Sequence, residues 1–125
     1  MVSVLVVDDH EAFLTFVKHG LSRHGYRPVV ATSGKTALRL LDTEAFEIAV
    51  IDVVMPDMDG IELLREIRDR RPNLPVVAMT GASDGLRQPV ATLLSVLGAC
   101  AVLIKPFAPA SLIQAIEDCL GARPG

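Results

Sequence analysis

The feature that most constrains the fold is an alternation between short apolar runs and segments with helical spacing. Residues 2–7 form a continuous β-branched run, VSVLVV, and four similar runs follow at 27–32, 47–52, 75–80 and 99–105. Uninterrupted apolar runs of this length are typical of strands that are buried on both faces of a parallel sheet. The sequence therefore predicts five strands of one sheet.

The segments between these runs predict helices. Amphipathic spacing favours helices over 9–25, 33–44, 60–70 and 109–121, and Pro89 is expected at the start of another. Gly25 is expected just after the end of the first helix. Five strand–helix units imply an open, three-layer, doubly wound parallel α/β sheet, since a closed barrel would need about eight units.

Length and charge narrow the function classes. The 125 residues fit a single domain over 1–125, and the formal net charge of -3 gives no general attraction for nucleic acid. The acidic N-terminus does not resemble a signal peptide, and no apolar run approaches the roughly 18 residues needed to span a bilayer. We therefore expect a cytoplasmic protein without direct nucleic-acid or membrane partners. Cys100 and Cys119 lack metal-ligand spacing, so two buried free thiols are favoured over a disulfide.

Polar residues follow four of the five apolar runs. Asp8 and Asp9 follow the first run, whereas Asp52, Thr80 and Lys105 end the third, fourth and fifth. Ligands of open parallel sheets bind outside the carboxyl ends of the strands, so we expect these side chains on one rim.

The chemistry of this set favours phosphoryl transfer. Two unit charges about 4 Å apart repel by roughly 4 kcal/mol at an effective dielectric of about 20, so three carboxylates on one rim need either protons or a cation. Mg²⁺ prefers such oxygen ligands. A lysine and a hydroxyl suit the oxygens of a phosphoryl group, and an aspartate is a competent nucleophile for it.

Five motifs together carry a family resemblance. They are VLVVDD in the first run, GY…A..G..AL at 25–38, IDVVMPDMDGIELL at 51–64, MTG at 79–81 and KPF at 105–107. With these motifs the chain resembles the receiver domains of bacterial two-component response regulators over residues 2 to about 120.

The resemblance implies a flavodoxin-like strand order 2-1-3-4-5 and a role for each rim residue. Asp52 would accept a phosphoryl group from a histidine kinase or a histidine phosphotransfer protein, and Thr80 and Lys105 would contact that group. Asp8, Asp9, Asp52 and the backbone carbonyl of Val54 would hold Mg²⁺. The Lys105-Pro106 peptide bond would be cis. The domain would catalyse only its own phosphorylation and dephosphorylation, and would signal through its fourth helix, fifth strand and fifth helix.

Simpler roles are open for several of these residues. Asp8 and Glu11 suit an N-cap pair for the first helix, which explains one of the two adjacent acids. Asp57 suits a turn, and Asp59 suits a helix cap. The three histidines, His10, His19 and His24, are expected on solvated faces, and so is the charge run at 65–71.

The sequence departs from the family pattern at two places. Val102 occupies the position, three residues before Lys105, where family members usually carry an aromatic residue that couples phosphorylation to output. The interval from Thr80 to Lys105 is about three residues longer than usual, with the surplus expected at 81–88. The helix after it carries almost no charge, and its outer face, at Thr92 and Ser95, is a candidate surface for a partner or a second copy.

Three other functions compete with this interpretation. DMDG at 57–60 resembles the motif of haloacid-dehalogenase-type phosphatases, but Asp57 does not end an apolar strand. The same residues lack the spacing of a calcium-binding loop. A receiver-like interaction module that is never phosphorylated also fits. The sequence leaves open whether the chain is a stand-alone receiver or a segment of a larger regulator or hybrid kinase.

Overall fold

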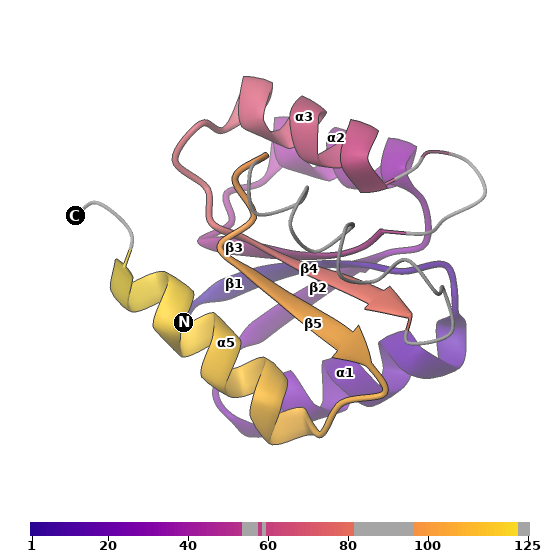
Figure 1. Cartoon of the computed structure of the whole chain (residues 1–125), viewed down its shortest axis with the longest axis vertical. Helices are drawn as coiled ribbons and strands as arrows, with labels where there is room; N and C mark the ends of the chain where they lie inside the picture. Colours follow the sequence, from indigo (N-terminus) through magenta and orange to yellow (C-terminus); the bar gives the residue numbers. More distant parts are fainter. Residues whose placement is uncertain (54–57, 59, 82–96, 123–125) are drawn as a thin grey trace.

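A computed structural model describes residues 1–53, 58, 60–81 and 97–122, and its strands form one parallel sheet (Figure 1). The strands are β1 (Ser3–Val7), β2 (Arg27–Ala31), β3 (Ile48–Asp52), β4 (Val76–Gly81) and β5 (Ala101–Lys105). Their order is β2-β1-β3-β4-β5, and every neighbouring pair is parallel. The predicted flavodoxin-like sheet is therefore confirmed. The first and last residues of each strand lie within about two residues of the ends of its predicted apolar run.

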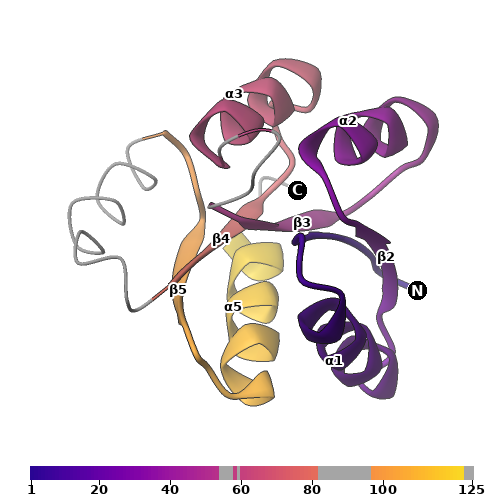
Figure 2. The ribbon, with the colours of Figure 1, turned by 90° about the vertical axis from the view of Figure 1, so that its right-hand side faces the viewer.

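Helices cover both faces of the sheet. Figure 2 shows α1 (Glu11–Arg23) and α5 (Pro109–Ala122) on one face, and α2 (Gly34–Thr43) and α3 (Gly60–Arg70) on the other. The helix expected to begin near Pro89, with its surface at Thr92 and Ser95, lies outside the described residues. So does most of the loop at 81–88.

The core consists of two apolar clusters, one on each face of the sheet. Successive side chains of a strand point to opposite faces, so β1 places Leu5 and Val7 against α2 and α3 and places Val4 and Val6 against α1 and α5. All five residues of β1 and of β3 are buried. Burial on both faces explains why the sequence shows continuous apolar runs instead of alternation.

The end of α1 confirms the predicted role of Gly25. Its φ of 82° lies in the left-handed region, which glycine adopts without a side-chain clash. Its N–H donates to the carbonyl of Ser22, and the N–H of Tyr26 donates to the carbonyl of Leu21. This pair of bonds is the Schellman motif, which directs the chain from α1 into β2.

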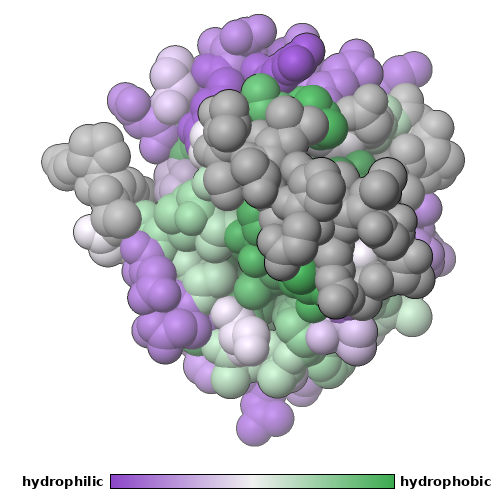
Figure 3. All heavy atoms as spheres, viewed as in Figure 1, coloured by the Kyte–Doolittle hydropathy of each residue, from purple (hydrophilic) through white to green (hydrophobic). Residues whose placement is uncertain are grey.

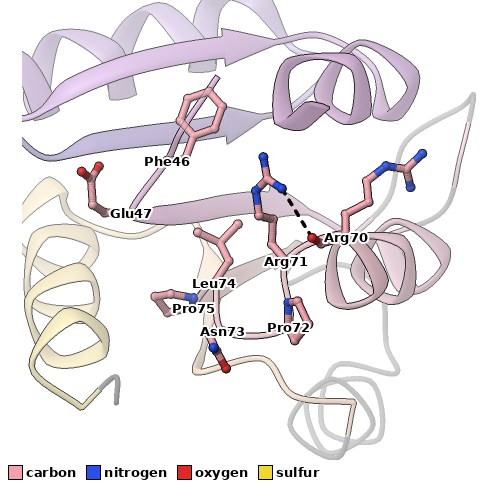
Figure 4. A pocket seen from close by; sticks show the side chains of 8 residues that line it. All are labelled: Phe46, Glu47, Arg70, Arg71, Pro72, Asn73, Leu74 and Pro75. Atoms are coloured by element: carbon pink, nitrogen blue, oxygen red, sulfur yellow. Dashed lines mark hydrogen bonds between the residues drawn. The ribbon is translucent and has the colours of Figure 1, made fainter. Parts of the chain in front are cut away.

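A pocket of about 310 Å³ lies at the end of the sheet where β3 and β4 begin (Figure 4). Its lining residues are Phe46, Glu47, Arg70, Arg71, Pro72, Asn73, Leu74 and Pro75. Arg70 forms ion pairs with Asp42 and Glu66, and Arg71 donates to the backbone carbonyl of Leu41. These arginines tie the end of α3 to α2, and they lie at the opposite end of the sheet from the polar rim.

The charge run at 65–71 is therefore more than a solvated helix end, as the contacts of Arg68 also show. The Arg68 guanidinium donates to the carbonyls of Pro72, Leu74 and Gly98. Partial burial lowers its pKa from the usual value. Arg68 thus joins the end of α3 to the segments that precede β4 and β5.

The two cysteines form a disulfide, so the expectation of free thiols was wrong. Cys100 lies just before β5 and Cys119 lies in the last turns of α5, and their Cα atoms are 5.9 Å apart. Helix α5 runs back along the sheet, antiparallel to β5, and so returns the chain to the point where the strand began. The two cysteines are 19 residues apart in the sequence, and no local motif indicates that they pair. Their pairing follows only from the return of α5 to the start of β5.

We expect reduction of the disulfide to lower the melting temperature. Closing a loop of about 20 residues stabilises a chain by roughly 3 kcal/mol in the chain-entropy model, which corresponds to about 10 °C for a domain of this size. Thermal melts of the wild type with and without a thiol reductant measure this difference. Cys100→Ser should melt like the reduced wild type and should not respond to reductant. Equal melting temperatures for the oxidised and reduced wild type would contradict the prediction.

Candidate functional site at the carboxyl rim of the sheet

The register of the sheet brings the predicted polar residues to one rim. Val7 of β1 pairs with Ile51 of β3, so Asp8 and Asp52 follow at the same level. Thr80 of β4 pairs with Ile104 of β5, which precedes Lys105. The rim is therefore built from four adjacent strands that end together, as the sequence predicted.

Lys105 forms the central contact of the site. Its Nζ lies 2.6 Å from Asp8 Oδ2 and 3.5 Å from Asp52 Oδ2. The Asp8 side chain is fully buried, and the Asp52 side chain is 6% exposed. Buried carboxylates are costly unless they are paired, so the lysine offsets part of the repulsion between the two acids.

Backbone groups also hold Asp8, in an arrangement that differs from the expected helix cap. The Asp8 N–H donates to the carbonyl of Ala31, and its Oδ1 accepts from the His10 N–H at 2.9 Å. Helix α1 begins at Glu11 with His10 at the N-cap. The N-cap pairing of Asp8 with Glu11 was therefore wrong, because the carboxylate of Asp8 turns toward Lys105.

The acids suit a hard cation such as Mg²⁺. Within the part of the chain that the structure describes, Asp9 Oδ1 is a buried oxygen without a hydrogen bond, although His10 Nδ1 lies 3.2 Å from it. Asp8, Asp9, His10 and Asp52 each offer one ligand atom, and these atoms lie within 4.8 Å of one another. A buried oxygen without a donor, beside two other carboxylates, is what an oxygen-preferring ion would satisfy.

Sequence reasoning missed two contacts at the rim. His10 is exposed, as expected, but its Nδ1 lies 3.1 Å from Asp8 Oδ1 and 3.2 Å from Asp9 Oδ1. The Phe13 ring lies under Lys105, with Nζ 4.2 Å from the ring centroid, a cation–π geometry. The signal for His10 was its place directly after the two aspartates. Phe13 stands at helical spacing with Val17 and Leu21, and that pattern gives no sign of a contact with Lys105.

The structure describes some of the other predicted site residues and leaves three of them undescribed. Thr80 is fully buried at the end of β4. The Lys105-Pro106 bond is cis, as predicted. Val102 packs against the core cluster on the α2 and α3 side. Val54, Asp57 and Asp59 lie outside the described residues, so the metal-ligand, turn and cap roles predicted for them stay predictions.

The fold and the rim define a doubly wound α/β domain with a cluster of acids and a lysine at the carboxyl ends of its strands, and comparison with known proteins identifies the family. Residues 4–117 match the family model described as the response regulator receiver domain. The chain belongs to this family, whose members accept a phosphoryl group within two-component systems.

Curated relatives match nearly the whole chain but are longer. The alkaline phosphatase synthesis transcriptional regulatory protein PhoP of Bacillus subtilis is 33% identical over 117 residues, which are 94% of this chain and 48% of that protein. The response regulator protein FleR of Pseudomonas aeruginosa is 38% identical over 129 residues, covering 98% of this chain and 25% of that protein. The chain thus spans half or less of the length of these relatives.

Solved structures agree with this assignment. A response regulator receiver domain protein from Clostridium thermocellum has a TM-score of 0.89 and 28% identity, covering 97% of this chain and 95% of that chain. A CheY-like receiver domain protein from Methanospirillum hungatei JF-1 has a TM-score of 0.87 and 32% identity, covering 97% and 94%. In the described residues of this protein, no helix has the length and apolar character needed to cross a membrane.

Gly60 fixes the end of the acidic segment that follows Asp52. Its N–H donates to the carbonyl of Val53 at 2.7 Å, so the first residue of α3 lies against the residue that follows β3. A Cβ at this position would lie 2.3 Å from Val53 Cα and 2.8 Å from Val53 O. These contacts are to backbone, which has no rotamer to change, so only glycine fits without displacing the residue after Asp52.

We expect Gly60→Ala to lower the melting temperature by roughly 3–10 °C, since overpacking typically costs about 1–3 kcal/mol. Gly20→Ala is the matched control. A Cβ at Gly20 meets nothing within 4 Å, and alanine in a helix interior is favoured over glycine by about 0.5–1 kcal/mol. Thermal melts of both variants measure the difference. A Gly60→Ala protein as stable as Gly20→Ala would contradict the close approach.

We also expect Lys105→Met to destabilise the fold by about 1–3 kcal/mol, because it leaves buried Asp8 without its cation. Added Mg²⁺ should raise the melting temperature of this variant more than that of the wild type, since the ion would replace the missing charge. Lys18→Met, at an exposed position on α1, is the control. Unchanged melting of Lys105→Met would show that the ion pair contributes no stability.

Proposed function

We propose that Asp52 is the phosphoacceptor of this receiver domain and that Lys105 and Thr80 contact the transferred phosphoryl group. The observation that carries the proposal is the position of Asp52 at the end of β3, with its Oδ2 3.5 Å from Lys105 Nζ. A nearly buried carboxylate beside a lysine is placed both to attack phosphorus and to have its product stabilised.

The reaction assigns one step to each side chain. An Asp52 carboxylate oxygen attacks the phosphorus of a phosphohistidine on the donor, the P–N bond breaks, and the donor imidazole takes up a proton. The negative phosphoryl oxygens then compete with Asp8 for the Lys105 ammonium, and Thr80 donates its hydroxyl hydrogen to another of them. Attack of water on the aspartyl phosphate later returns the carboxylate and releases phosphate. No other substrate is turned over, so the domain is not an enzyme in the usual sense.

Mg²⁺ completes the proposed site. Asp8, Asp9, Asp52 and the backbone carbonyl of Val54 would hold it, and the unbonded Oδ1 of Asp9 supports this assignment. When bound, the ion supplies positive charge that offsets the carboxylates and the incoming phosphoryl group.

The proposed donor is a sensor histidine kinase or a histidine phosphotransfer protein, and the proposed location is the cytoplasm. The output surface includes β5 and α5, together with the helix expected after Pro89. Every residue of β5 is only partly buried at the edge of the sheet. Figure 3 shows apolar residues on the visible part of the face around β5, and mostly hydrophilic residues at the top of the view, around α2 and α3. With Val102 at the usual aromatic position, we propose that output does not use a Thr80–aromatic rearrangement.

Intact-mass measurement with a small-molecule phosphodonor tests the proposal. We expect the wild type to gain the mass of one phosphoryl group when Mg²⁺ is present, and Asp52→Asn to gain none. Asp57→Asn is the control, since the residue belongs to the DMDG motif and is expected to shape a turn. Its phosphorylation should match that of the wild type.

Each competing function predicts a different result. No Mg²⁺-dependent gain in the wild type would favour an interaction module that is not phosphorylated. Loss of the gain in Asp57→Asn, with rapid hydrolysis of an external phosphate ester by the wild type, would favour a haloacid-dehalogenase-type phosphatase.

A further inference from the structure

His10 occupies an unusual place for a histidine. It is the N-cap residue of α1, where a side chain normally accepts a hydrogen bond from the first turn of the helix. The His10 side chain makes no such bond. Instead its ring faces the acids, with Nδ1 3.1 Å from Asp8 Oδ1 and 3.2 Å from Asp9 Oδ1, while 69% of the side chain is exposed.

The ring nitrogen lies within reach of an ion that the acids would hold. The ligand atoms of Asp8, Asp9, His10 and Asp52 span at most 4.8 Å. Metal–ligand distances of about 2.1 Å place ligands on opposite sides of an ion about 4.2 Å apart, so only a small contraction of the group is needed. The exposed ring is free of core packing and is able to make that adjustment.

Imidazole changes which ion such a site prefers. Mg²⁺ favours oxygen ligands, whereas Fe²⁺, Co²⁺, Ni²⁺ and Zn²⁺ accept imidazole nitrogen well. Neutral imidazole with its proton on Nε2 offers the Nδ1 lone pair to a metal. A site of three carboxylates and one imidazole therefore favours these transition-metal ions over Mg²⁺ more strongly than a site of three carboxylates alone.

We propose that His10 Nδ1 is a further metal ligand of this site and raises its affinity for divalent transition metals relative to Mg²⁺. The inference rests on the proposed function only in assuming that Asp8, Asp9 and Asp52 hold a divalent ion. It does not depend on phosphorylation of Asp52.

The test uses Co²⁺ and Mg²⁺ as probes of the whole chain. Titration calorimetry gives the dissociation constants of both ions for the wild type, for His10→Ala and for His19→Ala. His19 is an exposed histidine on the same helix and serves as the matched control. We expect His10→Ala to lose roughly tenfold or more of the preference for Co²⁺, with nearly unchanged Mg²⁺ affinity, and His19→Ala to match the wild type.

A spectroscopic readout separates ligation from a merely electrostatic effect. In proton NMR of the Co²⁺ complex, a coordinated imidazole gives a strongly shifted, exchangeable ring N–H signal. We expect this signal in the wild type and in His19→Ala, and its loss in His10→Ala. Binding of Mg²⁺ by His10→Ala in the calorimetric titration shows that the variant is folded.

Two results would overturn the inference, and they have different consequences for the proposed Mg²⁺ site. If Co²⁺ binds without a shifted imidazole signal and His10→Ala keeps the same preference, His10 is not a ligand, while the acidic metal site stands. If neither ion binds the wild type, both this inference and the proposed Mg²⁺ site fail.

Discussion

The contact on which the site depends is the ion pair between Lys105 and the buried carboxylate of Asp8. The two residues are 97 positions apart, and their 2.6 Å contact joins the first strand of the chain to the last. An aspartate with no solvent exposure would be unfavourable as an anion without a cation beside it. Because Lys105 also lies 3.5 Å from Asp52, the same ammonium keeps two acids together on one rim. It is also the group that a phosphoryl oxygen would draw away from Asp8.

The rest of the fold places these three side chains. Parallel pairing ends β1, β3 and β5 at the same edge of the sheet, and burial on both faces holds β1 and β3 in place. Gly60 then returns the chain against Val53, directly after Asp52. A rim made of strand ends holds charged groups close together before any ligand arrives, which is the preorganisation that phosphoryl transfer requires.

The strands, the core and the rim acids could be predicted because each has a local signal, whereas the strand order followed from the family resemblance. Continuous apolar runs mark buried strands, and a polar residue at the end of a run marks the rim. The disulfide had no such signal, because Cys100 and Cys119 meet only after α5 runs back along the sheet. The contacts of His10 and Phe13 were missed for a related reason. His10 was assigned to a solvated face, whereas its ring nitrogen lies beside Asp8 and Asp9, and the Phe13 ring of α1 lies beside Lys105.

The most direct test of the account is to locate the phosphoryl group on the chain. Borohydride reduces an aspartyl phosphate to homoserine, so peptide mapping after phosphorylation and reduction identifies the residue that reacted. The account predicts homoserine at position 52 alone, and only when the phosphodonor and Mg²⁺ were both present. Homoserine at Asp8, Asp9 or Asp57, or none at any position, would contradict it.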